Sequence, residues 1–160
     1  MRILLTLLVL FLASGHAVAK DDITKELTTS NGKKRVYYLY VPSTLKPDTQ
    51  APLLVTLHGS GRNGITLVEK WKDFAKKEGI ILAGPDASQP AGWSAPQDGP
   101  DFLRDLVEEL KTRYAINPRR VYLFGHSAGA CFARLCLKSL LSFSPGFSPV
   151  LPPRGFEKPF

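Results

Sequence analysis

The pentapeptide Gly125-His126-Ser127-Ala128-Gly129 has the residue types and spacing that could do chemistry. It matches the pattern G-x-S-x-G and lies between an apolar run at residues 121–124 and an Ala- and Leu-rich stretch at residues 128–141. Small residues around a serine allow a sharp strand-to-helix turn that leaves the hydroxyl free above a sheet. The helix that follows points the positive end of its dipole at a developing oxyanion. We therefore expect Ser127 to be the nucleophile of an acyl-transfer reaction.

Such a reaction also needs hydrogen-bond donors for the oxyanion of the tetrahedral intermediate. The backbone N–H of Ala128, directly after the nucleophile, is expected to be the first donor. The second is expected in the loop His58-Gly59-Ser60-Gly61, which follows an apolar run at residues 53–57. The glycines of this loop let the main chain approach a substrate, and Ser60 is the predicted donor.

Other residues that could act near this serine are interpreted as structural. His58 belongs to the loop that builds the oxyanion hole, and His126 is badly placed to reach the hydroxyl of its own neighbour. Asp86 and Asp98 precede the nucleophile and are assigned turn or capping roles. Trp93, on a long loop rich in Gly, Pro, Ala and Ser, is either a substrate-stacking residue or a packing aromatic.

Alternating strands and helices must position these residues. We expect strands at residues 35–41, 53–57, 80–83 and 121–124, and helices at residues 67–78, 102–114 and 128–141. Thr66 and Glu69 have the spacing of a capping box, Gly79 is expected to end the first helix, and Asp101 to cap the second. Continuous apolar runs are typical of strands covered on both faces. The pattern predicts a doubly wound, mostly parallel α/β sheet.

The N-terminus has the character of a secretory signal peptide. Arg2 precedes an apolar run at residues 3–13, and Ala17-Val18-Ala19 forms an A-x-A cleavage site. The run is shorter than the roughly 18 residues that a membrane-spanning helix needs. We expect residues 1–19 to be removed by cleavage after Ala19, which gives a secreted or periplasmic chain with no membrane anchor.

Composition narrows the remaining classes of function. The 160 residues suit one domain, and the net charge of +7 is spread over short clusters instead of forming a basic stripe. Because nucleic-acid binding requires such a stripe, we expect no nucleic-acid partner. Cys131 and Cys136 are the only cysteines, and their spacing on one predicted helix makes a disulfide between them geometrically poor. We expect buried free thiols.

Several stretches together are similar to one known family. They are residues 35–41, Leu57-His58-Gly59-Ser60-Gly61, Gly84-Pro85-Asp86-Ala87, Trp93 and residues 102–129. Over residues 33–138 the chain resembles secreted polyhydroxybutyrate depolymerases and feruloyl-esterase-like proteins of the α/β-hydrolase type. The resemblance implies a hydrolase of carboxylic esters, either an aliphatic polyester or a hydroxycinnamate ester. It also implies an acyl-enzyme, a serine activated by a histidine that an aspartate holds, and neither a metal nor an organic cofactor.

The tail departs from this family. In α/β-hydrolases the triad runs in the order Ser, Asp or Glu, then His, whereas residues 128–160 contain no Asp and no His. We expect residues 20–138 to be the N-terminal part of an α/β-hydrolase domain whose C-terminal part is missing. Residues 139–160 are expected to be an irregular, non-native or disordered tail. A reading frame lost near Lys138 is one explanation, and a natural short paralogue is the alternative.

Two functions follow from these observations. The chain is either a serine esterase by lineage, or a catalytically inactive fragment that at most binds ester ligands near Ser60, Trp93 and Ser127. The same turn and oxyanion hole would also serve a peptidase or an acyltransferase. With no strand expected after the nucleophile strand, an open sheet edge would favour self-association.

Overall fold

The computed structural model describes residues 21–46, 49–95, 97–143 and 147–148. The predicted signal peptide lies outside the described residues, as do residues 144–146 and 149–160 of the predicted tail. Within the described ranges, no helix is long and apolar enough to cross a membrane.

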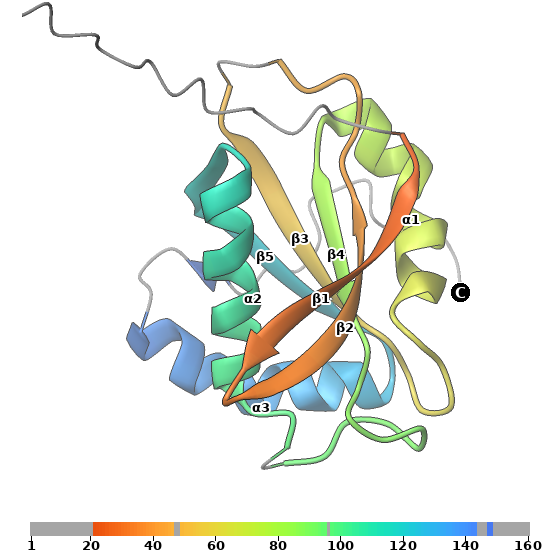
Figure 1. Cartoon of the computed structure of the whole chain (residues 1–160), viewed down its shortest axis with the longest axis vertical. Coiled ribbons are helices and arrows are strands. Elements are labelled where there is room, and N and C mark those ends of the chain that lie inside the picture. The colour runs from red at the N-terminus through yellow and green to blue at the C-terminus, as the bar shows by residue number, and fades with distance from the viewer. Residues whose placement is uncertain (1–20, 47–48, 96, 144–146, 149–160) are drawn as a thin grey trace, which may run out of the picture.

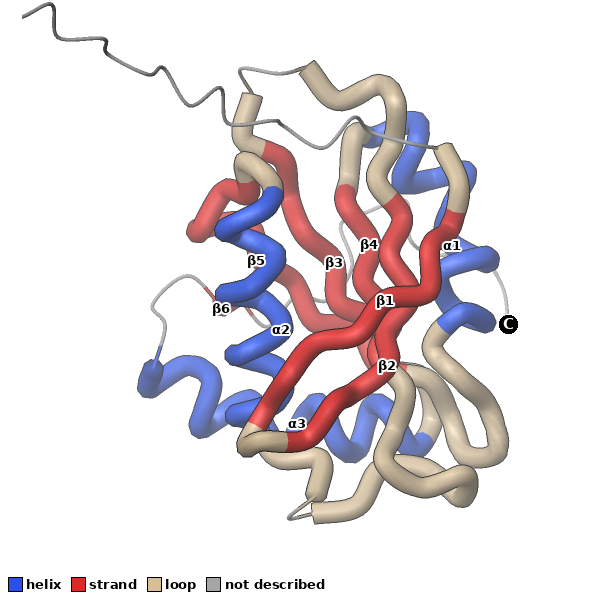
Figure 2. Tube along the Cα trace, in the orientation of Figure 1, coloured by secondary structure: helices blue, strands red, loops and turns tan. Residues whose placement is uncertain are grey.

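A six-stranded sheet forms the centre of the molecule, in the order β1-β2-β4-β3-β5-β6 (Figures 1 and 2). Its strands are β1 (Ile23–Ser30), β2 (Lys33–Tyr40), β3 (Ala51–Leu57), β4 (Ile81–Pro85), β5 (Ile116–Gly125) and β6 (Phe147–Ser148). β4, β3, β5 and β6 are parallel to one another, whereas β1 and β2 form an antiparallel hairpin that joins β4 in antiparallel fashion. The α/β sheet predicted from the sequence is confirmed, with an antiparallel hairpin added at one edge.

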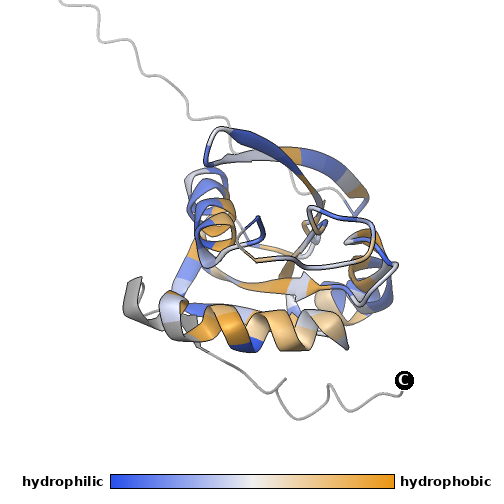
Figure 3. Ribbon diagram, turned by 90° about the horizontal axis from the view of Figure 1, so that it is seen from below, coloured by the Kyte–Doolittle hydropathy of each residue, from blue (hydrophilic) through white to orange (hydrophobic). Residues whose placement is uncertain are grey.

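Helices cover both faces of the sheet, so the fold is doubly wound. α1 (Ile65–Glu78) packs on one face in a cluster that includes Tyr40, Leu54 and Leu82. α2 (Pro100–Arg113) and α3 (Ala128–Phe143) share the larger cluster on the other face. Figure 3, coloured by hydropathy, shows apolar stretches along the central strands and along α3. The elements that carry the predicted site therefore rest on two buried cores.

The hairpin β1–β2 is held to α2 by a partly buried polar cluster around Glu26. The Glu26 carboxylate accepts hydrogen bonds from Thr24, Tyr37 and Arg113, and Arg113 also forms an ion pair with it. Burial alone would raise the pKa of Glu26, but these hydrogen bonds outweigh it and lower the pKa. Ser30, at the end of β1, donates to the Asp105 carboxylate at 2.6 Å.

The start of α1 differs from the sequence prediction. The prediction of a capping box at Thr66 and Glu69 is wrong. The helix begins at Ile65, so both residues lie inside it, and its N-cap Gly64 has no side-chain cap. The backbone N–H of Gly64 instead donates to the Asp86 carboxylate at 2.7 Å. Asp86, for which a turn or capping role was predicted, thus makes a tertiary contact with the residue that precedes α1.

Two other helix boundaries can be compared with their predictions. Gly79 ends α1 in the left-handed conformation, with φ 65°, as predicted. Asp101 is not the cap of α2, because the helix begins at Pro100 after Gly99, and Asp101 lies in its first turn. Proline suits this position because the first helical N–H has no partner within the helix.

The prediction that no strand follows the nucleophile strand in the sheet is wrong. β6 pairs with β5 in parallel at Val121 and Tyr122, so the nucleophile strand does have a following neighbour over these residues. The open edge that favoured self-association is therefore partly covered. α3 continues to Phe143, two residues beyond the predicted helix end.

The two cysteines are free, as predicted, but they differ in exposure. Cys136 is buried in the core shared by α2 and α3, whereas Cys131 is exposed on α3, against the prediction of two buried thiols. Burial, with a smaller contribution from the charge of Asp98, raises the pKa of Cys136 to about 11.

Candidate active site

The turn around Ser127 has the backbone that a strand-to-helix nucleophile requires. β5 ends at Gly125 and α3 begins at Ala128, so the serine stands between the strand and the helix. Its φ is +52°, in the left-handed region that residues other than glycine rarely adopt, and its side chain is exposed. Strain of this kind persists where the surrounding structure enforces it and clusters at active sites.

Close backbone contacts leave no room for a side chain at either glycine of the pentapeptide. A Cβ on Gly125 would lie 2.3 Å from the carbonyl oxygen of Gly129. A Cβ on Gly129 would lie 2.1 Å from the carbonyl oxygen of Leu57, on the neighbouring strand β3. Real Cβ atoms essentially never sit this close to backbone, so any other residue at either position would force the backbone of the turn to shift.

The predicted oxyanion loop packs directly on this turn. The backbone N–H of His126 donates to the Leu57 carbonyl at 3.0 Å, which fixes the turn to the end of β3. A Cβ on Gly59 would lie 3.1 Å from Nδ1 of the His126 ring and 3.4 Å from the Cβ of Ser127, so the two segments are in close contact here. The structure thus brings together the predicted nucleophile and the loop that carries its predicted donor.

Both predicted oxyanion donors are unpaired. Among the described residues, the backbone N–H groups of Ser60 and Ala128 take part in no hydrogen bond. They follow Gly59 and Ser127, the two residues that approach each other across the site. An oxyanion hole requires two such donors that point at one oxygen, and these two N–H groups lie on segments that adjoin each other.

His58 is buried, and both of its ring nitrogens are engaged. Its Nε2 accepts the backbone N–H of Ala87 at 3.1 Å, and its Nδ1 lies 2.8 Å from the carbonyl oxygen of Gly59. A histidine held in this way has no free nitrogen with which to take a proton from Ser127. The structural role predicted for His58 is confirmed.

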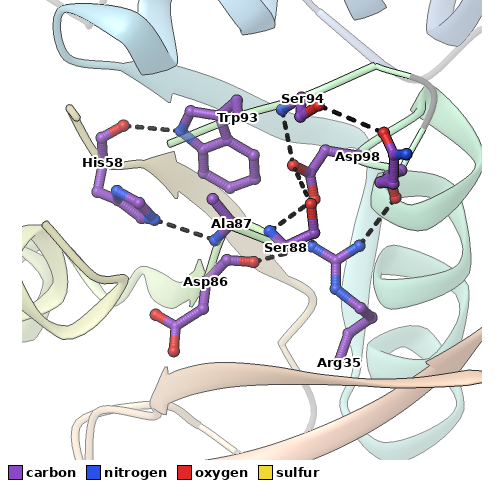
Figure 4. Close-up of polar contacts among 9 residues, drawn as sticks. Arg35, His58, Asp86, Ala87, Ser88, Trp93, Ser94 and Asp98 are labelled. Atoms are coloured by element: carbon purple, nitrogen blue, oxygen red, sulfur yellow. Dashed lines mark hydrogen bonds and ion pairs between the residues drawn. The ribbon is translucent and has the colours of Figure 1, made fainter. Parts of the chain in front are cut away.

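Trp93 contacts His58 from the long loop between β4 and α2 (Figure 4). Its indole Nε1–H donates to the carbonyl oxygen of His58 at 2.7 Å. The ring stacks on Phe132 of α3 with centroids 4.8 Å apart, and it tilts against the His58 ring at 4.9 Å. Because neighbouring rings and a hydrogen bond already occupy the indole, this geometry favours packing over substrate stacking.

The same loop is anchored by Asp98, which is fully buried. Its carboxylate forms an ion pair with Arg35 of β2 and accepts hydrogen bonds from Ser88 and from the backbone of Ser94 (Figure 4). The Arg35 guanidinium also lies 3.9 Å from the centre of the Phe102 ring. Sequence reasoning assigned a turn role to Asp98 but did not predict its partner, because the two residues lie on distant segments.

A shallow hollow of about 280 Å³ lies beside the oxyanion loop. Its lining is about equally polar and apolar, and the polar side chains include His58, Arg62, Asn63 and Gln89. Such a lining can offer hydrogen bonds to the hydroxyl groups of a polar ligand.

Comparison with known proteins places this geometry in context. No family model matches the chain. A bifunctional acetylxylan esterase/xylanase of Neocallimastix patriciarum is 28% identical over 129 residues, which are 78% of this chain and 19% of that protein.

Solved structures show the same fold. An acetyl xylan esterase from Aspergillus awamori superposes with a TM-score of 0.67 at 16% identity, over 80% of this chain and 51% of that one. A poly(3-hydroxybutyrate) depolymerase from Bordetella parapertussis gives a TM-score of 0.60 at 18% identity, over 72% and 46% of the two chains. The chain thus spans about half the length of these solved structures. The resemblance predicted from the sequence is confirmed at the level of the fold.

Proposed function

We propose that this chain, which has the α/β-hydrolase fold, carries the nucleophile and oxyanion hole of a secreted serine carboxylesterase. The observation that carries the proposal is the strained, exposed Ser127 on a glycine-enforced turn against the oxyanion loop. In this mechanism the Ser127 hydroxyl attacks the ester carbonyl, and the N–H groups of Ala128 and Ser60 stabilise the oxyanion. Collapse of the intermediate releases the alcohol and leaves an acyl-enzyme, which water then hydrolyses.

The proton of Ser127 must pass to a general base, and His58 cannot serve because its ring nitrogens are engaged. We propose that the base is a histidine contributed by a partner chain, because His16 lies in the predicted signal peptide and residues 128–160 contain no histidine. Serine is a poor nucleophile near neutral pH without such a base, so turnover depends on that contribution.

The polar side chains of Arg62, Asn63 and Gln89, which line the hollow beside the oxyanion loop, support an ester with a polar alcohol part. The acetylxylan esterases among the relatives suggest acetylated polysaccharide as a substrate. The sequence resemblance also implies an aliphatic polyester or a hydroxycinnamate ester as substrate. The similarity to the poly(3-hydroxybutyrate) depolymerase structure supports the polyester.

Export is also part of the proposal. Asp21, two residues after the predicted cleavage site at Ala19, accepts hydrogen bonds from Ser43, Tyr40 and Lys76. Cleavage after Ala19 would leave this anchor in the mature chain. Sequencing the N-terminus of the exported protein tests this point, and a product that begins at Lys20 is expected.

The proposed activity is tested by turnover of p-nitrophenyl butyrate with the mature chain and with its Ser127→Ala variant. A rate that is lost in the variant supports the esterase. Equal rates in the two proteins contradict it. Release of acetate from acetylxylan, of hydroxybutyrate from its polymer and of ferulate from its methyl ester then ranks the substrates.

An ester-binding protein without turnover is the second candidate. The engagement of both His58 nitrogens favours it, because no base is formed at the oxyanion loop. Under this alternative, a non-hydrolysable ester analogue binds equally well to the wild-type chain and to Ser127→Ala, and neither protein turns over p-nitrophenyl butyrate.

A further inference from the structure

The peptide unit between Gly59 and Ser60 is held from its carbonyl side. The Gly59 oxygen lies 2.8 Å from Nδ1 of His58 and accepts the backbone N–H of Arg62 at 3.2 Å. A trans peptide is planar, so its N–H points opposite to its C=O. The groups that hold the Gly59 oxygen therefore set the direction of the Ser60 N–H, the predicted second oxyanion donor.

The protonation of the His58 ring follows from its other contact. A backbone N–H can only donate, so the Nε2 that receives the Ala87 N–H must carry the lone pair. The proton of the neutral ring is then on Nδ1, where it donates to the Gly59 oxygen. Ala87 thus selects the tautomer that can hold the Gly59–Ser60 peptide unit.

His58 is held a second time through its backbone. Its carbonyl oxygen accepts the indole N–H of Trp93, whose ring stacks on Phe132 of the nucleophile helix. Ala87 and Trp93 belong to one loop, and that loop is anchored by the buried Asp98 carboxylate. Both donors that fix His58 therefore come from a segment with its own buried anchor (Figure 4).

We propose that His58 is a positioning residue that aims the Ser60 N–H at the oxyanion, with Ala87 selecting its tautomer and Trp93 holding its carbonyl. This inference rests on the proposed function in one respect, since it takes the Ser60 N–H to be an oxyanion donor. His58 also lines the hollow beside the oxyanion loop, but both of its ring nitrogens are engaged, so in this proposal it acts on the oxyanion only through the Gly59–Ser60 peptide unit.

The tautomer is tested without any enzymatic activity. In the ¹⁵N-labelled mature chain at neutral pH, long-range ¹H–¹⁵N correlations should show His58 with a protonated Nδ1 and an unprotonated Nε2. A ring protonated on Nε2, or on both nitrogens, would overturn the inference because it could not accept the Ala87 N–H.

The positioning role is tested with phenylboronic acid, which forms a tetrahedral adduct with a nucleophilic serine, and with matched variants. His58→Phe keeps a ring but removes the donor, whereas His58→Asn keeps an N–H near the position of Nδ1. His58→Phe should weaken the Ser127 adduct about tenfold, as expected for loss of one oriented hydrogen bond, and His58→Asn should restore most of it. Trp93→Phe, which keeps the stacking and removes only the indole N–H, should weaken it in the same direction.

The Ser60 amide resonance gives a readout that does not depend on the adduct. It should shift in His58→Phe and stay near its wild-type position in His58→Asn, in chains whose thermal unfolding shows them to be folded. Equal behaviour of Phe and Asn at this position, in affinity or in the Ser60 resonance, would refute the positioning role. A wild-type chain that forms no Ser127 adduct counts against the proposed function, and the Ser60 resonance then decides the positioning role by itself.

Discussion

Replacing Arg35 by methionine should destabilise the protein strongly, because it leaves a buried carboxylate without its counter-charge. The Asp98 side chain is 0% exposed and that of Arg35 is 10% exposed. Removing one partner of a buried ion pair costs about 3–5 kcal/mol. Asp98 keeps the donors of Ser88 and Ser94, and methionine keeps an apolar stem beside Phe102, so we expect the lower end, about 3 kcal/mol.

Urea unfolding followed by circular dichroism measures this loss. With an m value of about 2 kcal/mol/M, a loss of about 3 kcal/mol lowers the midpoint by about 1.5 M. Arg104→Met is the matched control, because Arg104 is 36% exposed and pairs with Asp101 at the surface, where ion pairs contribute about 0–1 kcal/mol. The double variant Arg35→Met/Asp98→Asn should lose less than the sum of its single variants, by at least about 1 kcal/mol. An Arg35→Met midpoint equal to that of Arg104→Met, or strictly additive losses, would refute the reasoning.

Three further predictions concern the turn, the hairpin and the thiols. Gly129→Ala should lower the free energy of unfolding by about 2–3 kcal/mol in urea titrations, since its Cβ would meet the backbone of Leu57; an unchanged midpoint would contradict the close contact. The lowered pKa of Glu26 contributes stability above the carboxyl's unfolded pKa, and this contribution is lost as the pH falls through the folded pKa. Glu26→Gln should therefore be less stable than the wild type at pH 7, and the difference should shrink as the pH falls below the unfolded pKa of the carboxyl; a difference that stays constant on acidification would count against the assignment. Iodoacetamide at pH 8 should alkylate Cys131 quickly and Cys136 only on unfolding, as read by mass spectrometry, and equal rates would show that Cys136 is not buried.

The sequence was most informative where several signals agreed. The apolar runs at β3, β4 and β5 predicted buried parallel strands, and the pentapeptide predicted the turn at Ser127, because only small residues fit between β5, α3 and β3. These features depend on local pattern and on glycines whose contacts follow from the turn itself.

The sequence analysis did not predict strand β1, because its alternation of polar and apolar residues is the reverse of the usual one. In β1 the inward positions are Glu26, Thr28 and Ser30, while the apolar Leu27 is 55% exposed, so the usual alternation is reversed. The turn Asn31-Gly32, with φ of 49° and 73°, is a two-residue hairpin signal that could have indicated a strand before it.

Tertiary contacts account for the other differences. The Asp86 carboxylate contacts the residue that precedes α1, and Asp98 pairs with Arg35 across the fold. No local pattern reveals a partner more than twenty residues away. The engagement of His58 by Ala87 and Trp93 has the same origin, since the long loop is brought to the oxyanion loop only when the sheet has formed.

The central claim, that Ser127 is an activated nucleophile beside an oxyanion hole, is tested most directly by the position of a covalent adduct. The mature chain is incubated with a fluorophosphonate, and the modified residue is located by tandem mass spectrometry. We predict one phosphonyl group on Ser127, absent from the Ser127→Ala variant. An unmodified chain, or label distributed over other serines at the same rate, would contradict the account.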